Sequence, residues 1–237
     1  TGDIDQNDGT GGNAGNSYHV LVFDGGTGIG PSVGPNVTTA TVLDGVTVTG
    51  GNADGSSLQN NGGGLYCDGQ GSGNECSPTL RRIAFTGNVA ATLGGAIFND
   101  GFEGTTRPVI TNATFTGNSA GNGGAIYNNG SLGTSSPQIT NATFTGNSAN
   151  SSEGGAIFND GSLGTSSPQI TNATFTGNSA SNFGGAIFNF GNSGTSRPVI
   201  TNTILWGNTA PNGPQVSNNN ATPTFAHSLI EGSGGSG

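Results

Sequence analysis

The amino-acid sequence predicts an all-β chain folded as a single right-handed parallel β-helix (β-solenoid) with coils of about 30 residues. Two motifs and their spacing lead to this prediction. The segment TNATFTGNSA begins at residues 111, 140 and 171, and GGAI begins at residues 94, 123, 154 and 184. A repeat of this length is too short to be a domain, so each copy is expected to form one turn of a solenoid.

Apolar residues at one position of the repeat give the coil length. They are separated by 30, 29, 31 and 30 residues, in the order Phe85, Phe115, Phe144, Phe175 and Leu205. The chain contains 47 glycines among 237 residues, a composition that could also indicate disorder. Disordered tracts do not keep apolar residues in register, so the regular spacing favours a folded solenoid.

Short β-strands are expected in each coil because Thr, Val, Ile and Phe occupy alternate positions, as they do in half-buried strands. In one repeat the strands are expected near residues 138–140, 142–145 and 156–158. Equivalent positions of successive coils would then stack at the interstrand spacing of about 4.8 Å. Parallel crossovers are overwhelmingly right-handed, which gives the predicted handedness.

The repeats divide the predicted single domain, residues 1–237, into four parts. Residues 1–60 are expected to form the N-terminal coils, residues 61–210 the regular GGAI/FTGN repeats and residues 211–231 the last coil. Residues 232–237 are expected to be a flexible Gly/Ser tail. No amphipathic helix that could cap either end is visible, so we expect further coils or end-to-end stacking there.

Alternation along the strands predicts which side chains face the core. In GGAIFN, Ile97 and Asn99 are expected to point inwards, and Ala96 and Phe98 outwards. In ITNATFTGN the expected inward set is Ile110, Asn112, Phe115 and Asn118. Stacked coils would then form an aromatic ladder of Phe85, Phe115, Phe144 and Phe175, and an aliphatic ladder of Leu65, Ile97, Ile126, Ile157 and Ile187.

Three columns of asparagines are predicted to form hydrogen-bonded ladders, because stacked amides can donate to one another and accept from one another. The columns are Asn88, Asn118, Asn147, Asn178 and Asn208; Asn99, Asn128, Asn159 and Asn189; and Asn112, Asn141, Asn172 and Asn202. In the last coil His227 occupies the position of the third column. The alternative is that these amides contact a ligand.

The two cysteines, Cys67 and Cys76, flank the loop DGQGSGNE. In repeat register both lie at the base of the loop that elsewhere runs from Asn99 to Thr106, so a disulfide between them is expected. Two buried free thiols are the alternative. A disulfide implies an oxidising compartment, and therefore an extracellular or cell-surface location.

Charge and hydropathy exclude two classes of partner. The formal net charge is −9, and the only Lys or Arg side chains are Arg81, Arg82, Arg107 and Arg197. Nucleic-acid binding requires many cationic groups, so that function is excluded. No run of about 18 apolar residues is present, so no membrane span is expected.

Catalysis is not expected. Four carboxylates within the repeats are predicted to lie in loops: Asp100, Glu103, Glu153 and Asp160. Glycoside hydrolysis would require a pair of carboxylates held across the bond, and no pair is held on a strand.

Calcium is the one cofactor that the sequence suggests. Asp3, Asp5, Asn7 and Asp8 alternate like half of a calcium-binding loop, with a solvated acidic turn as the alternative.

Two outward stripes are candidate contact surfaces. The first consists of paired threonines, at residues 47/49, 114/116, 143/145 and 174/176. Such an array is what ice-binding β-solenoids present, although threonine is also an ordinary exposed strand residue. The second stripe consists of Tyr66, Phe98, Tyr127, Phe158 and Phe188. It is expected to contact a neighbouring copy or a glycan, unless loops or Phe102, Phe183 and Phe190 cover it.

The GGAI motifs at residues 94–97, 123–126, 154–157 and 184–187, paired with FxxN at residues 85–88, 115–118, 144–147 and 175–178, resemble the repeats of chlamydial polymorphic outer membrane proteins. The runs GDIDQND, NSYHV, VLDGVTVTGGNADG and ILWGNTAPNGPQV also resemble secreted bacterial right-handed β-helix proteins of the choice-of-anchor type, over roughly residues 2–231. These resemblances imply an extracellular adhesive or structural role.

The sequence therefore predicts an extracellular structural protein that is not an enzyme: a self-associating fibre subunit or adhesin-like rod. A glycan-binding or ice-binding module is the alternative, followed by a polysaccharide-degrading enzyme. The expected partner is a second copy, end to end or laterally, and surface glycans are a further possibility.

Overall fold

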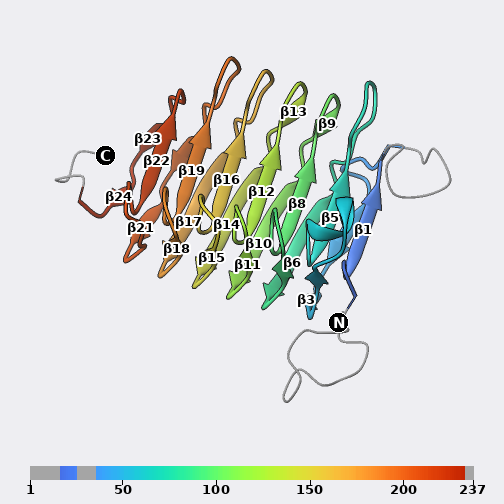
Figure 1. Ribbon diagram of the computed structural model, residues 1–237, viewed down its shortest axis with the longest axis horizontal. Helices are drawn as coiled ribbons and strands as arrows, with labels where there is room; N and C mark the ends of the chain where they lie inside the picture. The colour runs from blue at the N-terminus through green and yellow to red at the C-terminus, as the bar shows by residue number, and fades with distance from the viewer. Residues whose placement is uncertain (1–16, 26–35, 233–237) are drawn as a thin grey trace.

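The computed structural model describes residues 17–25 and 36–232. Within these residues the chain is a parallel β-solenoid, and its only helical segment is one 3-10 turn, η1 (Ser57–Asn60). The coils stack side by side along the long axis of the molecule (Figure 1). The predicted all-β parallel solenoid with coils of about 30 residues is thus confirmed.

Two large parallel sheets form the walls of the solenoid. The seven-stranded sheet contains, in spatial order, β1 (Leu21–Asp24), β5 (Leu65–Asp68), β8 (Ile97–Asp100), β12 (Ile126–Asn129), β16 (Ile157–Asp160), β19 (Ile187–Phe190) and β22 (Val216–Asn219). The ten-stranded sheet contains β2 (Val42–Asp44), β3 (Thr47–Thr49), β6 (Thr79–Thr86), β10 (Val109–Thr116), β14 (Gln138–Thr145), β17 (Gln169–Thr176), β20 (Val199–Thr201), β21 (Ile204–Trp206), β23 (Thr224–Ala226) and β24 (Leu229–Ile230).

Short strands complete each coil at its corners. The five-stranded sheet consists of β4 (Asn52–Ala53), β7 (Val89–Ala90), β11 (Ser119–Ala120), β15 (Ser148–Ala149) and β18 (Ser179–Ala180). A two-stranded sheet at the loops consists of β9 (Thr105–Thr106) and β13 (Thr134–Ser135). Identical residues face each other across the interior coils, as in the pairing of Phe144 with Phe175.

In β6, β10, β14 and β17 the first two strands predicted for the coil are one eight-residue strand, bent at a residue with left-handed backbone conformation. In β14 this residue is Asn141, with φ of +55°. Gly45, Arg82 and His227 adopt positive φ at the equivalent positions of other coils. Asparagine and glycine tolerate this conformation best, which explains the repeated asparagine.

The bend corrects one predicted orientation. Asn112 was expected to face the core, but it is exposed, and Ala113 is buried instead. The left-handed residue interrupts the alternation of the strand, so the buried positions Ile110 and Ala113 are three residues apart. The third asparagine column is therefore an external ladder, in which Asn141 Nδ2 donates to Asn112 Oδ1 at 3.1 Å.

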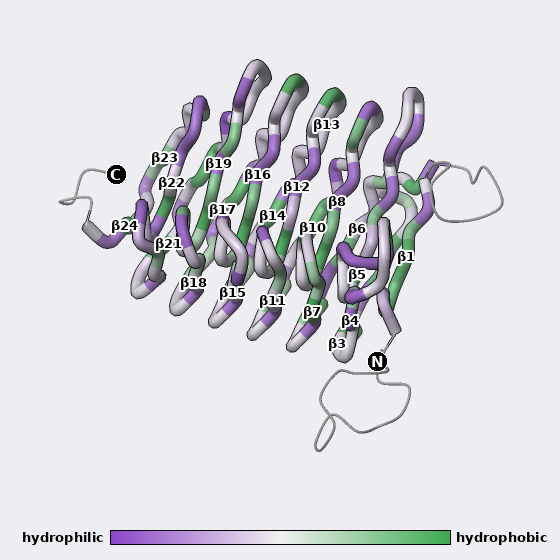
Figure 2. Tube along the Cα trace, in the orientation of Figure 1, coloured by the Kyte–Doolittle hydropathy of each residue, from purple (hydrophilic) through white to green (hydrophobic). Residues whose placement is uncertain are grey.

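The apolar core consists of continuous side-chain columns. The rings of Phe115, Phe144 and Phe175 are stacked at centroid separations of 4.6 and 4.5 Å and are parallel within 2°. The predicted aliphatic ladder is confirmed from Leu65 to Ile187. Hydrophobic residues recur at the same place in successive coils (Figure 2). Ala96 was predicted to face outwards, but it is buried in the main core because the strand begins only at Ile97.

Two buried asparagine ladders run beside the apolar columns and confirm the prediction. Asn88, Asn118, Asn147, Asn178 and Asn208 are all at most 3% exposed. In the second ladder Asn99 Nδ2 donates to Asn128 Oδ1 at 2.8 Å, and the same bond recurs in each following coil as far as Asn218. Each ladder satisfies buried backbone or amide groups at a corner of the coil.

The disulfide between Cys67 and Cys76 is present, with both residues fully buried. Cys67 pairs in register with Asn99, and Glu75 pairs with Thr105, which aligns Cys76 with Thr106. The disulfide thus occupies the loop base that an Asn and a Thr or Ser occupy in later coils.

The aromatic stripe faces outwards from the main core as predicted, and of the two alternatives for its exposure the covered one holds. Its five residues form a cluster separate from the main core and are only 0–7% exposed. Leu58, Leu93, Phe183 and Phe190 pack against them. The alternative in which Phe183 and Phe190 cover the stripe is therefore confirmed, and most of the stripe is inaccessible to a partner.

Candidate functional site

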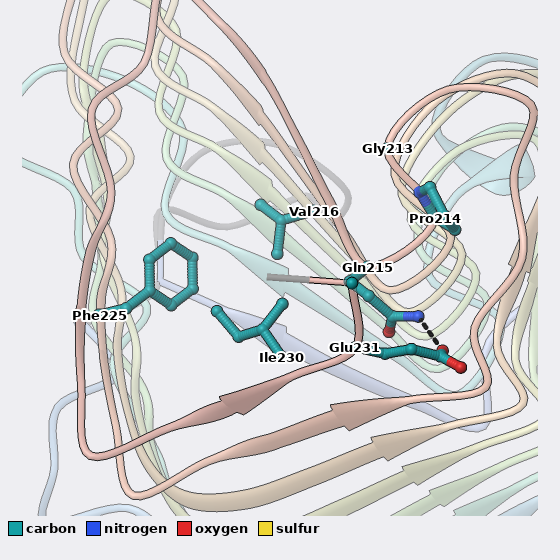
Figure 3. A pocket seen from close by; sticks show the side chains of 8 residues that line it. Gly213, Pro214, Gln215, Val216, Phe225, Ile230 and Glu231 are labelled. Carbon is teal, nitrogen blue, oxygen red and sulfur yellow. Dashed lines mark hydrogen bonds between the residues drawn. The ribbon is translucent and has the colours of Figure 1, made fainter. Parts of the chain in front are cut away.

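The C-terminal end of the solenoid contains a hollow of about 280 Å³ (Figure 3). Val216, Phe225 and Ile230 point into it from three different strands, β22, β23 and β24. Gly213, Pro214, Gln215, Glu231 and Gly232 line the remainder. All three apolar side chains are only partly buried, which makes this hollow an open end of the core.

The hollow exists because three apolar columns reach their last member here. Val216 follows Ile187 in the aliphatic ladder, Phe225 follows Ile200, and Ile230 follows Leu205 in the aromatic ladder. Among the described residues, β22, β23 and β24 each pair with another strand on one side only. Edge strands of this kind are templates for pairing with another chain.

The adjacent buried asparagine ladder, by contrast, is closed at this end. Asn208 Nδ2 donates to Gln215 Oε1 at 2.6 Å, and Gln215 Nε2 donates to Glu231 Oε2 at 2.7 Å. The backbone N–H of Gly207 also donates to Glu231 Oε2. The interior polar groups at the end are therefore satisfied, whereas the apolar groups remain partly in water.

At the opposite end the same three columns begin with apolar residues. Leu21 precedes Leu65, Leu43 precedes Leu80, and Val48 precedes Phe85. Leu21 and Leu43 are partly buried and pack against the main core. Val48 is only 2% exposed, so at this end two of the three columns, those that begin with Leu21 and Leu43, remain partly open.

Two of the four repeat carboxylates do not lie in loops as predicted. Asp100 and Asp160 are the last residues of β8 and β16 and do not lie in loops. Asp100 is buried and accepts hydrogen bonds from Tyr66 Oη at 2.8 Å and Asn129 Nδ2 at 2.9 Å. Burial raises the pKa of this carboxyl, opposed by the hydrogen bonds it accepts.

The sequence reasoning missed this pairing of tyrosine with aspartate across coils. Tyr127 Oη similarly donates to Asp160 Oδ2 at 3.1 Å. Burial, followed by the negative charge of Asp100, raises the pKa of Tyr66, and burial with Asp160 nearby raises the pKa of Tyr127. The available signal was the recurrence of Asp or Asn two residues after the first four aromatics of the stripe; Phe190 stands there after Phe188.

The predicted calcium ligands Asp3, Asp5, Asn7 and Asp8 lie outside the described residues. Within residues 17–25 and 36–232, no group of three or more His, Cys, Asp or Glu side chains could hold a metal ion. None of the helical segments in the same part of the chain is long and apolar enough to cross a bilayer.

The threonine stripe is in register but short. Thr114, Thr143 and Thr174 pair in sequence across three coils. At this position the preceding coil has Ala84 and the following coil has Ile204. At the second position of the pair, Thr176 is followed by Trp206 in the next coil. The regular part of the array therefore spans three coils only.

The fold and its open end define a parallel β-solenoid repeat protein. Four segments match the Chlamydia polymorphic membrane protein (Chlamydia_PMP) repeat, at residues 82–100, 112–129, 141–160 and 172–189. Each match runs from the positive-φ corner to the strand that begins at the Ile of GGAI, so it covers part of the ten-stranded wall and the seven-stranded wall of one coil. The resemblance to chlamydial polymorphic membrane proteins is thereby confirmed at the level of the repeat. No curated protein and no solved structure matches the chain.

Proposed function

We propose that this chain is a stiff structural segment of a bacterial surface protein, and that its solenoid assembles end to end with a second copy. The observation that carries the proposal is the hollow at the C-terminal end, where Val216, Phe225 and Ile230 leave the core partly exposed. Covering apolar surface of this kind is favourable by about 25 cal/mol per Å².

Register supports a head-to-tail contact. If a second copy continued the coils, Leu21 would stack on Val216 and Leu43 on Phe225, each within an existing apolar column. The edge strands β22 and β23 would pair with β1 and β2 of that copy. Such a heterologous contact does not close on itself, so repetition produces a filament.

The surface location rests on two observations. The Cys67–Cys76 disulfide fits an oxidising compartment outside the cytoplasm. The four repeat matches are to a repeat of polymorphic membrane proteins. The mechanism proposed is mechanical, since hydrogen-bonded coils with stacked Phe and Asn columns resist bending, and no catalytic step is assigned.

The test is sedimentation velocity and electron microscopy of the purified chain over a range of concentrations. Phe225→Asp places a charge in the open end and is expected to abolish filaments. Leu229→Asp is the matched control, because Leu229 lies on the neighbouring strand and is 51% exposed. A wild-type chain that stays a monomeric rod at all concentrations would overturn the proposal.

A mixing experiment distinguishes head-to-tail from symmetric contacts. Leu43→Asp blocks the N-terminal end, and Phe225→Asp blocks the C-terminal end. Each variant alone is expected to be monomeric, whereas the mixture forms a dimer and nothing larger. Folding of both variants is checked by circular dichroism.

Repeating the wild-type microscopy with a chelator tests the predicted calcium ligands at residues 3–8, because loss of filaments would assign a metal-dependent junction to them.

A further inference from the structure

The outer face of the seven-stranded sheet carries two adjoining hollows, of about 280 and 170 Å³. Glu153, Phe188 and Asn219 line both of them. The larger hollow is also lined by Tyr127, Phe158, Asp160 and Phe190, and the smaller by Phe183, Ser217 and Asn218. This groove is separate from the open core end, since the two share no lining residue.

The groove opens where the aromatic stripe ends. In register, Phe188 is followed by Ser217, a small residue that leaves one side of the Phe188 ring without a neighbour from the next coil. One wall also changes from coil to coil, because Leu93, Asn122, Glu153 and Phe183 occupy the equivalent position before each GG pair. At Glu153 the apolar cover found at Leu93 is missing.

Four aromatic rings converge on this place. The Phe188 centroid lies 5.0 Å from that of Phe158, 6.0 Å from Phe183 and 6.4 Å from Phe190. Phe183 and Phe190 are partly exposed. Aromatic faces carry partial negative charge and attract cations within about 6 Å of the ring centroid.

The walls add negative charge that no cation of the chain balances. Glu153 and Asp160 both line the larger hollow, from opposite sides of the stripe. None of the four arginines lines either hollow, and Arg81 and Arg82 pair with Asp44 instead. An anion is therefore repelled, and a cation is attracted by both the rings and the carboxylates.

Existing hydrogen bonds indicate which cation fits. Asp160 Oδ2 accepts from Tyr127 Oη, and Asp160 Oδ1 accepts from both the backbone N–H and the hydroxyl of Ser162. This carboxylate contributes charge while both its oxygens already have donors. At Asp160 a ligand without N–H or O–H groups on its cationic centre loses nothing, whereas an ammonium or a sugar hydroxyl would compete with Tyr127 and Ser162 for these oxygens.

We propose that this groove binds a quaternary ammonium group of the choline type. The Phe158, Phe183, Phe188 and Phe190 rings contact the N-methyl groups, and Glu153 and Asp160 balance the charge. The site goes beyond the proposed structural role, because it gives the rod a small-molecule headgroup to recognise on its side.

The experiment is titration of the intact chain with choline chloride, followed by saturation-transfer NMR of the choline methyl signal. Saturable binding with a dissociation constant of about 1 mM is expected for a few cation–π contacts. The neutral isostere 3,3-dimethyl-1-butanol is the ligand control and is expected to bind at least about tenfold more weakly, because it lacks the charge.

The repeat supplies variants that the fold already accommodates. Glu153→Asn installs the residue of the preceding coil, Asn122, and Phe190→Asn installs the residue found at Asn129. Each is expected to weaken choline binding by roughly threefold to tenfold. Glu103→Gln, at an exposed loop residue, is expected to leave it unchanged.

Three outcomes would overturn this proposal. Equal binding of choline and its neutral isostere would mean an apolar hollow without cation selectivity. Unchanged binding in Glu153→Asn would place the ligand elsewhere. Tighter saturable binding of a neutral sugar such as maltose at the same residues would assign the groove to glycans. Phe225→Asp is expected to bind choline normally, so failure of the assembly proposal and failure of this one are distinguishable.

Discussion

Asn118 and Asn147 are joined by two hydrogen bonds to a single oxygen. Asn147 Oδ1 accepts from Asn118 Nδ2 at 2.9 Å and from the backbone N–H of Asn118 at 3.0 Å. Asn147 Nδ2 in turn donates to Phe115 O and to Asn178 Oδ1. One amide thus satisfies a backbone donor and a backbone acceptor of the preceding coil, inside a site with no access to water.

Asn147→Ala is expected to destabilise the fold by about 2–4 kcal/mol, because the buried N–H of Asn118 and the carbonyl of Phe115 lose this amide as a partner. Asn147→Asp keeps the shape but turns the donor into an oxygen. Its destabilisation is expected to be at least as large at neutral pH and smaller below about pH 4, where the carboxyl is protonated and can donate. Urea unfolding at both pH values measures this.

The control for the ladder is Asn141→Gly in the exposed column. Asn141 lies at φ of +55°, and Gly45 occupies the equivalent position of an earlier coil. Glycine accepts this backbone conformation, so Asn141→Gly is expected to lower the free energy of unfolding by less than about 1 kcal/mol. Equal costs for Asn141→Gly and Asn147→Ala would show that burial of the ladder is unimportant.

Removal of the disulfide tests its structural contribution. Cys67→Ala with Cys76→Ala is expected to cost about 2–3 kcal/mol, since the bond closes a short loop. Cys67→Asn with Cys76→Thr restores the residues of the next coil and offers a donor to Asn99 Oδ1, a buried oxygen with no hydrogen bond in the described part of the chain. The Asn/Thr pair should therefore recover part of the loss in thermal unfolding. A pair less stable than the double alanine variant would contradict the equivalence of the two loop bases.

The aromatic ladder is expected to tolerate leucine better than alanine. Phe144 is fully buried between Phe115 and Phe175, and Leu205 already occupies the same column. Phe144→Ala opens a cavity and is expected to cost about 3–5 kcal/mol. Phe144→Leu is expected to cost about half as much, because it loses ring stacking but refills most of the volume. Guanidinium unfolding of both variants checks the order.

Tyr66 is expected to make stability fall in alkali. Burial and then the Asp100 charge raise its pKa in the folded chain, so the folded state keeps the phenol proton where the unfolded state releases it. The stabilisation that Tyr66 contributes is complete below about pH 10, the pKa of tyrosine in the unfolded chain. It is lost as the pH rises above that pKa, by about 1.4 kcal/mol per pH unit.

Tyr66→Phe tests this dependence, with Tyr18→Phe at an exposed ring as the matched control for loss of a hydroxyl. Below pH 10 the Tyr66 variant is expected to be less stable by about 1–2 kcal/mol, because Asp100 loses a donor. Above that pH the difference in unfolding free energy between the two proteins is expected to narrow, because the wild-type protein loses stability. Parallel stability curves for wild type and variant would contradict the assignment.

The coil length, the aliphatic and aromatic ladders and the three asparagine ladders were predictable because each is a local pattern repeated in register. Asn112 and Ala96 were misplaced for one reason: simple alternation fails at a corner, and the corners depend on backbone dihedrals that residue types only suggest. Asp100 was placed in a loop for the same reason, since its strand continues one residue beyond the Asn ladder.

By itself, the sequence determined the solenoid, its period and the columns that stabilise it, because a repeated apolar spacing can bury its residues only by stacking. The tertiary structure decided which surfaces remain open. The aromatic stripe is covered where Leu93 and Phe183 pack against it, and it is open beside Glu153. The apolar core is open at Val216, Phe225 and Ile230. Both outcomes depend on contacts between coils about 30 residues apart, where one changed side chain in a neighbouring coil covers or uncovers a site.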